Sequence, residues 1–389
     1  MRNILLSTTA LTLTAGIAAA DVSVSGSFKL GYNDTGTVGN ALTKTGSFDP
    51  TTGLPIVTTV AQSADYVAGN AKDKNNGVYN DAGITFAMSS TMDSGMTASV
   101  TADMNGGDTV NNAVGAYTLA LASDGLNVTF GTTEYSAITN WKSAGDMGTD
   151  TWANQNADGK NVIRADVTLG GLAVSASANV STGAKASPDP LSITVGGSLG
   201  GASYVVASEG SKMGISVSTA AGGATVTSAY STAPTLDAAG AEVAPAAMNT
   251  STGVKIAYPM GAITTTAAYV MESNGTGAAG AGIQADSWEI AAVYAAGGTS
   301  VTFKTDDNSK NSVEGSATMG AATVYAGLAD NLEDMYLAVS NPLGGGATLM
   351  ASYAIDGDDL VAGGSSAAGD EIGAGDWQEG LTIELKFAF

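Results

Sequence analysis

Alternation of apolar and polar residues with a period of two constrains the fold of this chain more than any other feature. From residue 163 to residue 169, apolar residues occupy the odd positions, and Arg164, Asp166 and Thr168 occupy the even positions. The same alternation recurs in residues 22–32, 84–88, 300–305 and 381–389. Neighbouring residues of a strand point to opposite faces, so the pattern predicts strands with one apolar and one polar face. After residue 17 no run of 18 apolar residues occurs, and we expect no membrane-spanning helix.

Two architectures can use such strands, and composition distinguishes them. A soluble sandwich buries its apolar faces between two sheets, whereas a membrane barrel turns them to lipid and encloses a polar lumen. The chain has 52 glycines among 389 residues, only 13 % charged residues, and few Leu and Ile. This composition suits a polar lumen better than a thick aliphatic core. We therefore predict an all-β fold, a closed antiparallel transmembrane β-barrel.

Two absences and the net charge exclude several functions. The chain contains no cysteine and no histidine, which removes disulfides, thiol nucleophiles, the Ser-His-Asp triad and the usual zinc sites. Its formal net charge of -22 excludes a basic nucleic-acid-binding surface. We expect neither an enzyme nor a nucleic-acid-binding protein, and no cofactor.

The first twenty residues have the three parts of a secretory signal peptide. Arg2 supplies the positive charge, a mostly apolar stretch extends to Ile17, and three alanines precede Asp21. We predict a signal peptide over residues 1–20 and a single barrel domain over residues 21–389. The apolar stretch is shorter than a spanning helix requires.

Short turns separate the alternating segments at fairly regular spacing. Nine of them contain glycine, and they are Asp93–Gly95, Asp124–Gly125, Gly170–Gly171, Gly200–Gly201, Gly222–Gly223, Met260–Gly261, Gly297–Gly298, Met319–Gly320 and Gly344–Gly346. With the first and last strands they predict about 20 strands; 16 or 18 are the alternatives if some turns belong to longer loops. The largest opposite connections are Asn33–Asn80, Thr132–Lys160, Thr232–Asn249 and Asp356–Trp377. Short turns at one end and long loops at the other are typical of outer-membrane barrels.

Aromatic residues mark strand ends and the end of the chain. Tyr204, Tyr258, Tyr294 and Tyr325 lie close to turns, which predicts an aromatic girdle at the lipid–water boundary, although tyrosine also simply favours strands. The last strand alternates through Phe387 and stops on Phe389. This ending resembles the C-terminal signature that the outer-membrane assembly machinery reads in bacterial barrels.

Several segments in order resemble the alphaproteobacterial general diffusion porins. They are Asp21–Gly26, Ile84–Met96, Leu126–Gly131 before a long loop, and the ending Leu385–Phe389. The resemblance implies a homotrimer in outer-membrane lipid, with 16 strands per barrel as the family norm. It implies a water-filled channel for small hydrophilic solutes and ions, and a third external loop that folds into the lumen.

The resemblance also implies a constriction in which loop carboxylates face basic residues of the wall. The third loop covers about residues 132–160, and its acidic candidates are Glu134, Asp146, Asp150 and Asp158. The wall candidates, phased toward the lumen, are Lys29, Arg164, Lys255, Lys304 and Lys386. Opposed charges penalise apolar solutes and orient water. Arg164 is the single arginine after residue 20, a departure from the arginine cluster of the family, and with 36 carboxylates on the chain we expect cation preference.

Other readings remain open from the sequence. One is a substrate-selective channel; another is a non-channel exported β-rich surface protein or adhesin. Glu134, Tyr135, Trp141 and Trp152 form the nearest approach to a sugar site, although a constriction loop explains them as well. Acidic external loops could instead bind Ca²⁺. The residues of that cluster are Asp356, Asp358, Asp359, Asp370, Glu371 and Asp376.

Overall fold

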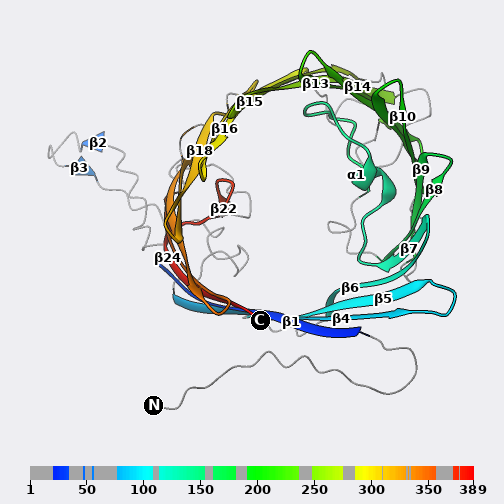
Figure 1. Cartoon of the computed structure of the whole chain (residues 1–389). Coiled ribbons are helices and arrows are strands. Elements are labelled where there is room, and N and C mark those ends of the chain that lie inside the picture. Colours follow the sequence, from blue (N-terminus) through cyan, green and yellow to red (C-terminus); the bar gives the residue numbers. More distant parts are fainter. Residues whose placement is uncertain are drawn as a thin grey trace.

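The structure is a computed structural model, and most of the chain after residue 20 forms one closed barrel (Figure 1). It describes residues 21–34, 47–48, 55–56, 77–107, 114–153, 161–180, 191–235, 248–274, 285–308, 310–329, 332, 334–355, 371–375 and 377–389. The predicted signal peptide lies outside the described residues, as do Asp158 and most of the acidic cluster between Asp356 and Asp376. No helix in the described part is long and apolar enough to cross a membrane.

Twenty antiparallel strands form the barrel wall. They are β1 (Asp21–Asp34), β4 (Gly77–Thr91), β5 (Thr97–Gly107), β6 (Val114–Ser123), β7 (Leu126–Gly131), β8 (Val162–Leu169), β9 (Leu172–Asn179), β10 (Ser192–Leu199), β11 (Ala202–Glu209), β12 (Lys212–Ala221), β13 (Ala224–Pro234), β14 (Met248–Met260), β15 (Ile263–Ser273), β16 (Ser287–Ala296), β17 (Thr299–Asp306), β18 (Ser312–Met319), β19 (Ala322–Ala329), β20 (Asp334–Gly344), β21 (Ala347–Ile355) and β24 (Gly380–Ala388). The shorter elements are β2 (Ser47–Phe48), β3 (Pro55–Ile56), α1 (Ser136–Asn140), β22 (Glu371–Ile372) and β23 (Trp377–Gln378). The predicted count of 20 strands is confirmed, and the alternatives of 16 and 18 are wrong.

The first and last strands close the barrel. β1 pairs with β4 along one edge and with β24 along the other. The terminal Phe389 extends this seam, because its backbone exchanges two hydrogen bonds with Gly26, of 2.7 and 3.0 Å. A Cβ at Gly26 would lie 2.6 Å from the Phe389 ring, so the absence of a side chain there admits the ring. Lys29 and Lys386 lie directly opposite each other across this seam.

All nine predicted turns join neighbouring strands at one end of the barrel. In Gly222–Gly223 the two φ angles are +59° and +85°, values that favour glycine and match the twist of a tight hairpin. The other end carries the longer loops, with one exception that the sequence analysis missed. β11 and β12 are joined there by only Gly210 and Ser211, and the φ of +60° at Gly210 allows this tight connection.

Burial along the strands is inverted relative to a soluble protein. On β12, Ile215 is 42 % exposed on the outer face, whereas its neighbour Ser216 is 5 % exposed on the inner face. β20 and β24 repeat the pattern, with Leu337 and Ile383 exposed and Ala338 and Glu384 buried. An apolar outer face needs a non-aqueous surrounding, so the barrel presents this face to lipid.

The tyrosines predicted to form a girdle divide between the two faces. Tyr258 and Tyr294 are exposed on the outer face, and Tyr204 pairs there with Val217. The prediction is wrong for Tyr325, which lies in the lumen with its ring centroid 5.5 Å from that of Trp377. Its phase on β19 decides the side, since its cross-strand partner is the buried Ala338.

Adjacent residues of β17 give a matched test of this inside-out arrangement. Phe303 is exposed on the outer face and Thr302 points inward. We expect Phe303→Lys to lower the free energy of unfolding by about 2–4 kcal/mol, because a charge in the lipid-facing band loses its hydration. Thr302→Lys should leave it nearly unchanged. Denaturant unfolding in lipid vesicles measures both, and equal effects would contradict the assignment of faces.

Candidate pore constriction

The third loop, between β7 and β8, folds into the barrel and lies against the inner wall of β9 to β15 (Figure 1). It carries the short helix α1 close to its start, and its described part ends at residue 153. The loop covers one side of the lumen, and inward-facing side chains of the wall make many of the contacts that fix it.

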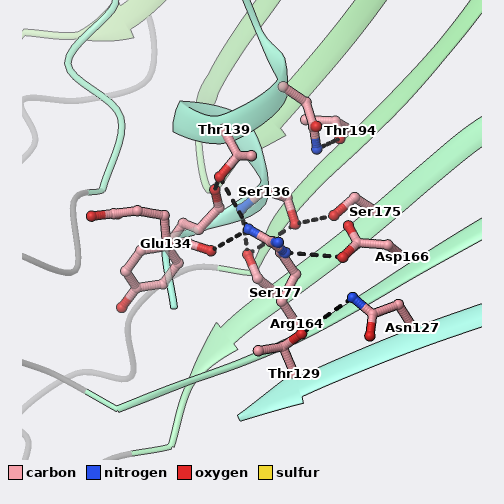
Figure 2. Close-up of polar contacts among 12 residues, drawn as sticks. Asn127, Thr129, Glu134, Ser136, Thr139, Arg164, Asp166, Ser175, Ser177 and Thr194 are labelled. Atoms are coloured by element: carbon pink, nitrogen blue, oxygen red, sulfur yellow. Dashed lines mark hydrogen bonds and ion pairs between the residues drawn. The ribbon is translucent and has the colours of Figure 1, made fainter. Parts of the chain in front are cut away.

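Wall hydroxyls satisfy the first backbone N–H groups of α1. Figure 2 shows Ser136 of this helix beside Ser175 and Ser177 of the wall. The N-cap residue, Tyr135, provides no side-chain cap. Instead the backbone N–H of Ser136 donates to Ser177 Oγ at 2.8 Å, and that of Ala137 donates to Ser192 Oγ at 3.0 Å. Unpaired N–H groups at a helix start need partners when buried, and here the barrel supplies them.

Arg164 joins the start of the loop to β8. Its Nη1 donates to the Glu134 carbonyl oxygen and to Thr139 Oγ1, both at 3.1 Å, while Nε pairs with Asp166 Oδ2 at 3.1 Å (Figure 2). The guanidinium therefore holds the loop as well as facing the lumen. Beside it lies a cavity of about 580 Å³, which Asp166 and Asn140 also line.

Two wall glutamates hold the second half of the loop. Glu272 accepts hydrogen bonds from the Gly148 backbone N–H at 2.9 Å and from Ser251 Oγ at 2.6 Å. Glu209 accepts one from the Ala153 backbone N–H at 2.9 Å. Wall hydroxyls add to these anchors, because the Thr149 backbone N–H donates to Ser251 Oγ at 3.1 Å and the Thr149 hydroxyl is hydrogen-bonded to Ser231 Oγ at 2.6 Å.

Small residues of the wall make room for the apolar side of the loop. Trp141 and Trp152 are buried, with ring centroids 5.6 Å apart, and both would contact a Cβ at Gly214 at 2.8–3.0 Å. A Cβ at Gly253 would lie 2.3 Å from the Ala144 carbonyl oxygen. The loop therefore packs where the wall lacks side chains.

The acidic candidates of the loop occupy different environments. Asp146 is exposed, and Glu134 and Asp150 are half-buried. Burial, together with the nearby carboxylates of Asp146 and Glu272, raises the pKa of Asp150 to about 6. Among the described residues no group of three or more acidic side chains is arranged to hold a metal ion.

The basic candidates line the inner wall at separate places. Lys29 and Lys386 share one carboxylate, Glu384, at 3.5 and 3.2 Å. Lys255 borders a cavity of about 320 Å³ together with Asp146 of the loop. Lys304 borders a different cavity, of about 240 Å³. Among the described residues, the structure brings a loop acid and a wall base together at Asp146 and Lys255, and it brings no described loop acid to Lys29, Lys304 or Lys386.

A family model described as Gram-negative porin matches residues 7–356. The chain belongs to the Gram-negative porin family. It is an outer-membrane protein that crosses the membrane with the strands of its barrel, and the predicted family membership is confirmed.

Solved porin structures show weaker similarity. An engineered variant of the Rhodopseudomonas blastica porin is 14 % identical and covers 95 % of this chain and all of its own, with a TM-score of 0.39. A triple mutant of the same porin is 13 % identical over the same shares, also with a TM-score of 0.39. No curated protein matches the chain.

The wall residues that anchor the third loop were not predicted from the sequence. Glu209, Glu272 and the wall serines sit at inward positions of alternating strands, where a polar residue is expected in any case. Nothing local distinguishes them from lumen-lining residues that touch only water. A glycine on the inner face of a strand, such as Gly214 or Gly253, is the one signal that indicates a closely approaching segment.

Gly253→Val tests the packing of the loop. The added side chain would meet the Ala144 backbone, so we expect the loop to shift and Trp141 and Trp152 to become accessible to water. Quenching of tryptophan fluorescence by a soluble quencher should increase. Ala257→Val, at an inward position further along β14, is the matched control. Equal quenching in both variants would show that the loop does not depend on this glycine.

The raised pKa of Asp150 predicts that the ion selectivity of the channel changes with pH. A carboxyl group whose pKa is raised to about 6 takes up its proton between neutral pH and pH 5, which removes one negative charge from the loop. Because the packed loop binds this proton more tightly than the unfolded chain does, the contribution of the group to packing is fully present below its ordinary pKa of 3.8 and is lost as the pH rises through about 6. We expect cation preference, read from reversal potentials, to fall from pH 7 to pH 5 in the wild type. In Asp150→Asn this fall should be smaller, and an unchanged fall would assign it to other groups.

Proposed function

We propose that the barrel forms a water-filled channel for passive diffusion of small hydrophilic solutes and ions, with a preference for cations. The observation that carries the proposal is the polar inner wall, whose charged side chains remain exposed. The side chain of Lys386 is 46 % exposed and that of Lys29 is 32 % exposed, although both point inward. In the described part of the chain, the buried apolar clusters lie where loop segments pack on the wall. A lumen without a packed core leaves a path for water.

The charges near the third loop support the preference for cations. The cavity of about 320 Å³ is bordered by Asp146, Glu289, Asp306 and Asp307, with Lys255 as its basic residue. Glu384 pairs with both Lys29 and Lys386 and offsets one of their two positive charges, and Asp166 offsets Arg164. An excess of carboxylates raises the local concentration of cations and lowers that of anions.

The sequence resemblance supports the remaining parts of the proposal. We infer a homotrimer in outer-membrane lipid, inserted by the assembly machinery that reads the Phe387–Phe389 ending, and a protein without catalytic activity. A selective sugar channel has less support, because Tyr135, Trp141 and Trp152 are buried against the wall and offer no ring to a solute.

Single-channel recording tests this function directly. The folded protein in a planar bilayer should give stepwise currents in groups of three, and a salt gradient should give a reversal potential of the sign expected for cations. Heat-denatured protein is the control. Absence of conductance from protein that shows the heat-modifiable mobility of a folded barrel would contradict the channel, and anion preference would contradict the charge argument.

A further inference from the structure

We propose that the β22–β23 hairpin is a second constriction element, which narrows the lumen from the side opposite the third loop and helps to set the size limit for solutes. This inference rests on the proposed channel function. In Figure 1 the hairpin projects into the barrel from the wall near β18 to β24, whereas α1 lies across the lumen beside β7 to β10. Two inward segments on opposite walls restrict a pore more than one segment does.

Apolar contacts fix the hairpin to the wall. Ile372 is 2 % exposed and Trp377 is 6 % exposed, and both belong to a buried cluster with Tyr336, Ala338 and Ala354 of β20 and β21. The ring centroid of Trp377 lies 5.8 Å from that of Tyr336. Burial of these side chains in an otherwise hydrated lumen gives the hairpin one preferred position.

A wall glutamate fixes the tip of the hairpin. Glu314 Oε2, on β18, accepts hydrogen bonds from the Ala374 backbone N–H at 2.7 Å and from the Tyr336 hydroxyl at 2.9 Å. At the other end, Asn33 Nδ2 donates to the Glu379 carbonyl oxygen at 3.0 Å. The hairpin is therefore bound to the wall at both ends.

The fit of the hairpin repeats that of the third loop. A Cβ at Gly327 of β19 would lie 2.5 Å from the Tyr336 ring, so the missing side chain makes room for this ring, which packs on Trp377 of the hairpin. Glu314 accepts a hydrogen bond from a backbone N–H of the hairpin. Glu209 and Glu272 accept hydrogen bonds from backbone N–H groups of the third loop in the same way. Both segments thus combine a glutamate anchor, an inward glycine and a buried tryptophan.

Solutes would pass through the part of the lumen that lies between the two segments. The cavity bordered by Asp146 of the third loop and the cavity bordered by Glu314 share two residues, Glu289 and Asp306. These two residues lie directly opposite each other on β16 and β17. The narrowest part of the channel would therefore lie beside this carboxylate pair, with a segment on each side.

Because the chain has no cysteine, a single cysteine can report on the hairpin without disturbing the fold. Ala374 is exposed at the hairpin tip, and only its backbone N–H contacts Glu314, so Ala374→Cys should preserve the anchor. We expect a bulky membrane-impermeant thiol reagent to lower the single-channel conductance of this variant by about 1.5-fold or more, because the label occupies the constriction. Ser94→Cys, in the exposed turn between β4 and β5, is the control and should keep its conductance.

A second set of variants releases the hairpin instead of labelling it. Trp377→Ala and Glu314→Ala should each raise the conductance and admit larger sugars in vesicle-swelling assays, because alanine removes the ring that packs the hairpin or the oxygen that accepts its backbone N–H. Asp103→Ala removes a carboxylate on β5, where Asp103 accepts a hydrogen bond from Thr85 Oγ1, and it should not change the size limit. Unchanged conductance of fully labelled Ala374→Cys would overturn the second constriction, whether or not Trp377→Ala folds. A wild-type protein that does not conduct would overturn the channel function itself, and with it this inference.

Discussion

The absence of hydrogen-bonding partners in lipid is the constraint on which the rest of this structure depends. A strand inside a bilayer must pair its backbone on both edges, so a spanning sheet must close on itself. β1 performs the closure by pairing with β4 and β24, and the last residue of the chain, Phe389, completes the seam at Gly26. The apolar outer residues follow from the same constraint, since the outer face of each strand meets lipid rather than water.

The interior of the barrel meets a different requirement. It must hold loop segments in a polar lumen without a large apolar core. Ser and Thr hydroxyls and three wall glutamates pair with backbone N–H groups of the inserted segments. Glycines and alanines on the inner face leave room for Trp141, Trp152 and Trp377. This use of small and hydroxyl-bearing residues accounts for a composition that is poor in the Leu and Ile of a thick aliphatic core.

Much of the fold could be predicted from the sequence because two of its signals are local. Alternation assigns each side chain to a face, and glycine-containing turns mark one end of every hairpin, which together led to 20 strands. Contacts between a loop and the wall are not local in this sense. Glu272 and Glu314 have the same phase as any lumen-facing residue, and Tyr325 differs from the outward Tyr258 only by the phase of its strand. The tight Gly210–Ser211 connection was missed because the loop end was expected to carry only longer connections.

Accessibility along one strand tests the central claim most directly, that the outer face meets lipid and the inner face meets water. β16 is suitable because it lies between the two inserted segments. Single cysteines at the six positions 288–293, in the protein reconstituted into vesicles, would be treated with a small membrane-impermeant thiol reagent. We expect labelling at the inward positions of Glu289, Ala291 and Val293 and protection at Trp288, Ile290 and Ala292. Uniform labelling, or protection of the inward set, would contradict a water-filled barrel in a membrane.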